Sequence, residues 1–208
     1  PEWLAVPEDA NDLVPAIWPA SAHRDADGEL IIGGVEAGLL ARTYGTPLQV
    51  IDEGEVRRRA AAIRSAFDAA AEAHGTSARV YYAGKALLNT TIVRWVTDEG
   101  LNVDVCTGGE LEVALAAGAD AGRLGFHGNN KSVPELERAV EVGVGTIIID
   151  SEIEIERLAA IVSRTGTTQR VMLRVNSGVH AETHDFLATA HEDQKFGFSI
   201  ASGDAFEA

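Results

Sequence analysis

A lysine at the end of an apolar run is the first residue of this chain that could do chemistry. Residues 79–86 read Arg-Val-Tyr-Tyr-Ala-Gly-Lys-Ala, which is typical of a strand buried on both faces of a parallel sheet. Lys85 lies at its carboxyl end, where barrels and open α/β sheets keep their reactive groups. We expect Lys85 to be half-buried there, because desolvation would then favour a neutral amine able to attack a carbonyl. The alternative is a lysine that extends into solvent.

Three further polar residues accompany later strand patterns. Side chains alternate along residues 103–106, so Asp104 and Cys106 share one face, opposite two valines. Asp104 could reach the lysine, or it could cap the next helix. Arg174 lies inside an apolar run, where a buried charge must be paired. His127 begins a loop rich in glycine and asparagine whose N–H groups could bind an anion, although a lone loop histidine is more often polar surface.

A metal site is the other chemistry that the sequence raises. His180, His184 and His191 lie close together in the chain. Zinc sites usually combine histidines with a carboxylate or a cysteine at a defined spacing, and this set lacks that pattern. We therefore expect no metal. The sequence also contains no nucleophile elbow, no P-loop and no CxxC motif.

Composition narrows the class of protein. The 208 residues are 46% hydrophobic and carry a net charge of −15. The only basic run, residues 57–59, belongs to a mixed-charge helix pattern, so nucleic acid is not expected as a partner. No apolar run approaches the ~20 residues of a membrane span, and the first residues lack a signal pattern. The single cysteine, Cys106, excludes an internal disulfide. We expect a soluble, cytoplasmic protein.

The elements that must position these residues follow a regular rhythm. Strands are predicted at residues 48–51, 79–85, 102–106, 123–126, 146–149 and 170–175, with helices between them. Three helices begin with Ser/Thr-x-x-Glu, at Thr107, Ser132 and Ser151, which predicts a capping box at each. The alternation indicates parallel βα units in a barrel or a doubly wound sheet. A barrel is favoured because no G-x-G-x-x-G follows a strand.

The first 45 residues have a different pattern. Four prolines punctuate residues 1–19, and a turn at residues 25–28 precedes a predicted strand at 29–32. A short helix is predicted over residues 35–44, with Gly45 at its end. Asp52 is predicted to cap the long helix that follows.

Four motifs together resemble a known enzyme family. They are Tyr-Ala-Gly-Lys-Ala at 82–86, Val-Asp-Val-Cys-Thr-Gly-Gly-Glu at 103–110, Phe-His-Gly-Asn-Asn-Lys-Ser at 126–132 and His-Glu-Asp-Gln-Lys-Phe-Gly at 191–197. Their order and spacing are similar to those of diaminopimelate decarboxylases, especially actinobacterial ones. The resemblance runs from about residue 45 onward. Ornithine and arginine decarboxylases and alanine racemase are weaker relatives that share the fold.

The resemblance implies a (β/α)8 TIM-like barrel of the alanine racemase type, incomplete in this chain, with an N-terminal contribution to a β-domain. Residues 1–53 would contribute to the β-domain, and residues 54–208 would form a partial barrel that binds pyridoxal phosphate. The family's phosphate-binding and substrate-binding residues match positions beyond residue 208. We therefore expect the sequence to be part of a longer enzyme.

The resemblance also implies a reaction and a site. Relatives of this kind bind pyridoxal 5'-phosphate covalently on the lysine that matches Lys85. Asp104 and Arg174 match positions close to the cofactor, and His127 matches a loop position near it. The implied enzyme is a homodimer that decarboxylates the amino acid meso-2,6-diaminopimelate to L-lysine, the last step of lysine biosynthesis. The alternatives are an ornithine- or arginine-type decarboxylase, or a non-catalytic barrel protein that binds the cofactor.

Overall fold

The computed structural model describes residue 9, residues 11–177 and residues 196–208, and the chain divides into two compact units, residues 1–65 and 66–208. The first unit holds an antiparallel sheet in the order β1 (His23–Arg24), β2 (Leu30–Ile32) and β3 (Val35–Glu36). The helix α1 (Ala37–Tyr44) follows and ends at Gly45, whose φ of 81° suits a residue without a side chain. The strand predicted at residues 29–32 and the helix predicted at residues 35–44 are confirmed. The helix begins two residues later than predicted because β3 pairs with β2.

The strand predicted at residues 48–51 is wrong. These residues form no strand, and Leu48, Val50 and Ile51 are exposed. A four-residue apolar run forms a strand only where a partner offers backbone hydrogen bonds, and no described strand pairs with it. The chain continues into α2 (Glu53–Ala73). The carboxylate of Asp52 accepts the N–H of Glu55 at 3.2 Å, so the predicted cap is confirmed.

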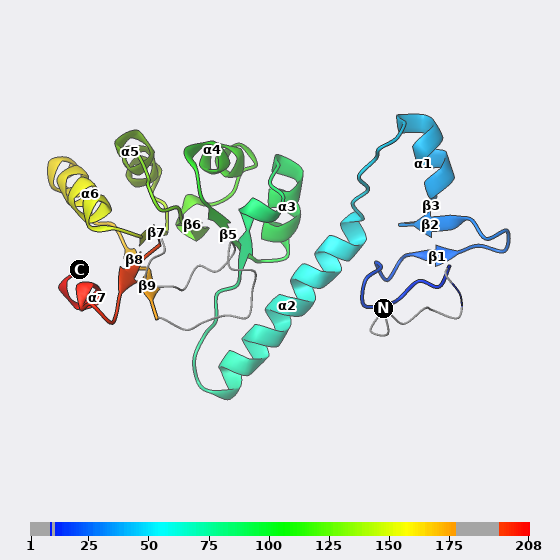
Figure 1. Cartoon of the computed structure of the whole chain (residues 1–208), viewed down its shortest axis with the longest axis horizontal. Coiled ribbons are helices and arrows are strands. Elements are labelled where there is room, and N and C mark those ends of the chain that lie inside the picture. The colour runs from blue at the N-terminus through cyan, green and yellow to red at the C-terminus, as the bar shows by residue number, and fades with distance from the viewer. Residues whose placement is uncertain (1–8, 10, 178–195) are drawn as a thin grey trace. The chain divides into compact units, whose positions relative to one another are not determined.

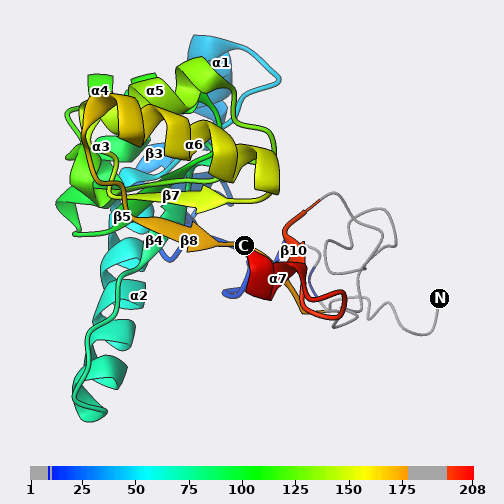
Figure 2. The ribbon, with the colours of Figure 1, turned by 90° about the vertical axis from the view of Figure 1, so that its left-hand side faces the viewer.

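Five parallel strands form the sheet of the second unit. In chain order they are β4 (Tyr81–Ala83), β5 (Asn102–Val105), β6 (Leu124–Phe126), β7 (Thr146–Ile149) and β8 (Val171–Leu173). Each strand pairs with the next, and the crossovers are α3 (Thr90–Asp98), α4 (Gly108–Ala116), α5 (Val133–Val142) and α6 (Glu152–Thr165). These four helices cover one face of the sheet (Figures 1 and 2). The predicted α/β class is confirmed, because parallel strands joined by short helices require this layering.

The core of this unit lies between the sheet and those helices. Val103 and Val105 of β5 are fully buried, as are Leu111 of α4 and Leu136 of α5. Burial of such side chains stabilises the fold by about 1.5–3 kcal/mol each. The two valines therefore fix which face of β5 meets the helices. Asp104, which alternates with them, lies on the opposite face, as predicted.

Only one of the three predicted capping boxes is complete. The Ser132 hydroxyl accepts the N–H of Glu135, whose carboxylate accepts the N–H of Ser132. Thr107 accepts the N–H of Glu110, but the Glu110 carboxylate accepts the N–H of Cys106, one residue further back. Ser151 makes no capping bond, so that prediction is wrong. Glu154, its expected partner, instead accepts the N–H of Asp150 at 2.9 Å.

The two outer strands of the sheet are shorter than predicted. Of residues 79–85, three form β4, and Tyr81 and Tyr82 are only half-buried. The prediction that this strand is buried on both faces is wrong, because β4 lies at an edge of the described sheet. The run at 170–175 divides at Arg174 into β8 and β9 (Val175–Asn176). β9 pairs in parallel with β10 (Phe198–Ser199), which precedes the short helix α7 (Asp204–Glu207).

Candidate active site

Lys85 lies just beyond β4 in a single 3₁₀ turn, η1 (Gly84–Ala86). The phenol of Tyr82 donates to the carbonyl of Leu87 at 2.7 Å, which closes this turn against the end of the strand. Lys85 is exposed, so the predicted half-burial is wrong. The reason is local: the turn carries the lysine past the edge strand, and Gly84 rather than Lys85 is buried against β5.

All four residues singled out in the sequence border one cavity of about 440 Å³ at the carboxyl ends of the strands. The β4–η1 segment, the ends of β5 and β6, and the residues Arg174 and Phe196 supply its walls. The lining residues are Ala83, Gly84, Lys85, Asp104, Cys106, His127, Gly128, Asn129, Arg174 and Phe196. The sequence predicted that the reactive groups would lie at this end of a parallel sheet.

Asp104 and His127 form the acidic and imidazole side of the cavity. The carboxylate of Asp104 lies 3.4 Å from Nε2 of His127, an ion pair when the ring is protonated. The backbone N–H of His127 donates to the carbonyl of Val105 at 2.7 Å, which holds the start of the loop against β5. Asp104 does not cap α4, since Thr107 does. The carboxylate therefore borders the cavity and does not serve as a helix cap.

Arg174 forms the cationic side. Its guanidinium lies 3.5 Å from the carboxylate of Asp150 and 4.4 Å from the centre of the Phe196 ring. The expected pairing of this charge is confirmed, although its side chain is 34% exposed rather than buried. Asp150 is only 1% exposed and also accepts the backbone N–H of Gly197. One buried carboxylate thus holds both the guanidinium and the turn that follows Phe196.

Cys106 adds a thiol to the same wall. Burial, together with the charge of Glu110, raises the pKa of the Cys106 thiol above its usual range. The thiol is therefore protonated at neutral pH and is a weak nucleophile.

Lys131 lies close to this cavity but differs from Lys85 in every respect that matters for an amine. Its side chain is 1% exposed, and Nζ donates to the carbonyls of Gly128 and Ile148 and to the carboxylate of Glu154. An ammonium has three donors, so all of them are used. Among the lysines that the structure describes, Lys85 is therefore the one with an accessible amine.

The comparisons with known proteins agree with this geometry. Residues 53–208 match the family described as pyridoxal-dependent decarboxylase, pyridoxal binding domain. The chain belongs to this family. It is 50% identical over 196 residues to diaminopimelate decarboxylase of Mycobacterium tuberculosis, a match that covers 94% of this chain and 42% of that protein. The diaminopimelate decarboxylase of Mycobacterium leprae is 49% identical over 208 residues, which are 100% of this chain and 43% of that protein.

A solved structure shows the same fold. The crystal structure of diaminopimelate decarboxylase from M. jannaschii in complex with L-lysine superimposes with a TM-score of 0.80 at 30% identity, covering 91% of this chain and 43% of that one. The expected resemblance and fold type, a partial α/β barrel of the alanine racemase kind, are thereby confirmed. The chain spans a little over two fifths of the length of the relatives it matches.

The residues present in this chain fit a pyridoxal group. An accessible amine, a carboxylate and an imidazole surround a cavity whose floor is formed by backbone at Gly84 and Gly128. A Cβ at Gly128 would lie 2.8 Å from the carbonyl oxygen of Cys106, and its φ is +106°. Only glycine allows the backbone to adopt this φ and to pack this closely against Cys106. Lys85 would hold the aldehyde, and Asp104 and His127 would face the bound group.

Sequence reasoning missed three members of this region: Lys131, Asp150 and Glu154. Glu154 could have been found, because it continues the buried stripe of α6 one turn before Leu158 and two turns before Ile161. An acid in such a stripe requires a partner. Asp150 carried no comparable signal, since an aspartate that follows a strand is usually a helix cap.

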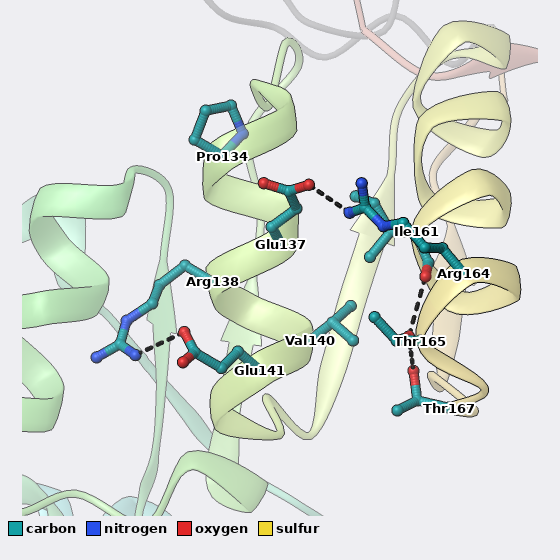
Figure 3. Close-up of a pocket in the computed structure, with 9 residues that line it drawn as sticks. All are labelled: Pro134, Glu137, Arg138, Val140, Glu141, Ile161, Arg164, Thr165 and Thr167. Carbon is teal, nitrogen blue, oxygen red and sulfur yellow. Dashed lines mark hydrogen bonds and ion pairs between the residues drawn. The ribbon is translucent and has the colours of Figure 1, made fainter.

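Another cavity, of about 530 Å³, lies between α5 and α6 on the outside of the sheet (Figure 3). Its charges are already paired, Arg164 with Glu137 and Arg138 with Glu141, and no predicted site residue borders it. His180, His184 and His191 lie outside the described residues. Within the described ranges, no group of three or more His, Cys, Asp or Glu residues could hold a metal ion.

Proposed function

We propose that the protein containing this chain is a carboxy-lyase that uses pyridoxal 5'-phosphate to convert meso-2,6-diaminopimelate into L-lysine and carbon dioxide. The observation that carries the proposal is the accessible amine of Lys85 in a cavity shared with Asp104, His127 and Arg174. The names of the relatives support the substrate. The L-lysine in the M. jannaschii complex is the product that this reaction would release.

The chain's own residues would have separate tasks. When bound, pyridoxal phosphate draws electrons from the substrate Cα, which makes loss of carbon dioxide easier. Lys85 would bind the cofactor's aldehyde carbon through Nζ and, once displaced by the substrate amine, could carry a proton to or from the substrate. Asp104 would orient the ring and keep His127 in place. Arg174 would supply positive charge at the other side of the cavity.

The organisation of the longer protein belongs to the same proposal. Residues 1–53, which hold the antiparallel sheet, would contribute to a β-domain, and residues 54–208 would belong to the cofactor-binding barrel. The start of the family match at residue 53 supports this boundary. We also propose that the protein is a homodimer located in the cytoplasm. None of the described helices is long and apolar enough to cross a bilayer.

The test is an assay of the purified natural protein that contains this sequence. With pyridoxal phosphate and meso-diaminopimelate it should release carbon dioxide and L-lysine in equal amounts. L-ornithine and L-arginine, assayed at the same concentration, should be decarboxylated at least about tenfold more slowly. Faster release from either one would replace the proposal by a decarboxylase of the ornithine or arginine type. Bound cofactor without release from any substrate would indicate a non-catalytic protein.

A further inference from the structure

A buried ion pair lies next to the candidate site without touching the cavity. The ammonium of Lys131 and the carboxylate of Glu154 are 3.0 Å apart, and their side chains are 1% and 0% exposed. Removing two charges from water costs several kcal/mol per ion, and a pair of apolar residues would often be at least as stable. The presence of charge at this position therefore calls for an explanation other than stability.

The hydrogen bonds of the pair join three separate segments. Lys131 donates through Nζ to the carbonyl of Gly128 at 2.7 Å and to the carbonyl of Ile148 at 2.6 Å. Glu154 accepts the backbone N–H of Lys131 at 2.8 Å and that of Asp150 at 2.9 Å. The loop after β6, the end of β7 and the first turn of α6 are thereby fixed to one another.

One of these segments supplies a wall of the cavity, and another holds a residue of a second wall in place. The loop carries His127, Gly128 and Asn129, all of which border it. Asp150 holds the guanidinium of Arg174 and the N–H of Gly197. The geometry of both the imidazole side and the cationic side therefore depends on a pair that no substrate would touch.

We infer that Lys131 and Glu154 are positioning residues that set the His127–Asn129 loop and Asp150 at the distances the site requires. Apolar residues of the same volume could fill the space, but they could not bind the carbonyls of Gly128 and Ile148 or the N–H of Asp150. The effect on cofactor binding rests on the proposed function. The effect on the loop does not, because it is a property of the protein without ligand.

The main variant is Glu154→Gln, which keeps the volume and one acceptor oxygen but removes the charge. Glu112→Gln is the matched control, because Glu112 of α4 makes an exposed ion pair with Arg138 of α5. Amide hydrogen exchange of the cofactor-free natural protein is measured by mass spectrometry. Exchange of residues 127–131 should rise by about tenfold or more in Glu154→Gln, while residues 108–116 of α4 and the whole control stay within about twofold of wild type.

The second readout is the dissociation constant of pyridoxal phosphate, followed by absorbance. It should rise about tenfold in Glu154→Gln and in Lys131→Met, and not in Glu112→Gln. If Lys131→Met does not fold, Glu154→Gln alone decides. Unchanged exchange at 127–131 with cofactor affinity within about twofold of wild type would overturn the inference. Exchange that rises equally in α4 would also overturn it, because the pair would then only stabilise the fold.

These outcomes are separate from those of the proposed function. A wild-type protein that released no carbon dioxide, combined with faster exchange confined to residues 127–131 in Glu154→Gln, would remove the proposed reaction and leave the positioning role intact. Normal carbon dioxide release by wild type, combined with unchanged exchange and cofactor affinity in Glu154→Gln, would support the proposed reaction and overturn the positioning role.

Discussion

Asp104 borders the same cavity as Lys85 and lies 3.4 Å from the imidazole of His127. Its position on β5 is set by its neighbours, because Val103 and Val105 are buried beneath the helices and the residue between them must face the other way. The carboxylate is thus held by the strand itself rather than by a mobile loop.

Replacing this carboxylate by an amide should lower turnover with little effect on folding. Asp104→Asn keeps the size of the side chain but removes the charge that faces the cavity, and we expect turnover to fall by more than about tenfold, or about 1.4 kcal/mol. Asp120→Asn is the control, since Asp120 caps the 3₁₀ turn η2 (Ala121–Arg123) before β6, at the strand end away from the cavity. Steady-state kinetics and thermal unfolding measure both effects. Unchanged turnover in Asp104→Asn would remove Asp104 from the site.

Cys106 should react slowly with alkylating reagents. Burial and the nearby charge of Glu110 raise the pKa of its thiol, so the reactive thiolate is scarce at neutral pH. Iodoacetamide labelling, followed by mass spectrometry of the peptide that contains Cys106, should be slow at neutral pH and increase only above the ordinary pKa of a thiol. Labelling as fast as that of the urea-unfolded protein would show that the thiol is not held in this environment.

At the scale of elements, the loops at the carboxyl ends of the strands make the site, and the opposite ends only support it. Gly128 and Gly145 provide a matched comparison. A Cβ at Gly128 would contact the backbone of Cys106 at the cavity, whereas a Cβ at Gly145 would lie 2.1 Å from the carbonyl of Gly122, before β7.

Alanine at either glycine should destabilise the fold, by about 1–3 kcal/mol, because backbone must move in both cases. Of the two variants, only Gly128→Ala should also weaken binding of pyridoxal phosphate, because Gly128 borders the cavity and Gly145 does not. Thermal unfolding and a cofactor titration separate the two effects. Equal loss of cofactor affinity in Gly145→Ala would mean that binding follows stability rather than the geometry of the loop.

Much of the arrangement of elements could be predicted from the sequence, because local patterns decide it. Alternation in β5 and the Ser132 capping box are short-range effects, and both are confirmed. The failures depend on residues far apart in the chain. The run at 48–51 has no partner among the described strands. Ser151 loses its glutamate because Lys131, 23 residues away from Glu154, competes for the carboxylate.

At the scale of the molecule, the site draws on residues from Ala83 to Phe196, which span most of the second unit. Lys85, Asp104, His127 and Arg174 were each predicted from the sequence as candidate site residues. Their meeting at one cavity follows from the parallel order β4-β5-β6-β7-β8, which places the carboxyl ends of all five strands on one side. The exposure of Lys85 was not predicted, because the apolar run up to this residue indicated a continuous strand, whereas the chain turns at Gly84–Ala86 and carries the lysine past the strand end.

The most direct test of this account is to locate the covalently bound cofactor. The natural protein that contains this sequence is loaded with pyridoxal phosphate, reduced with borohydride and digested, and the peptides are mapped by mass spectrometry. The sequence contains three lysines, at positions 85, 131 and 195. We expect the phosphopyridoxyl group on Lys85 and none on Lys131, whose ammonium is buried and fully hydrogen-bonded. A modified Lys131 or Lys195 with Lys85 unmodified would contradict it.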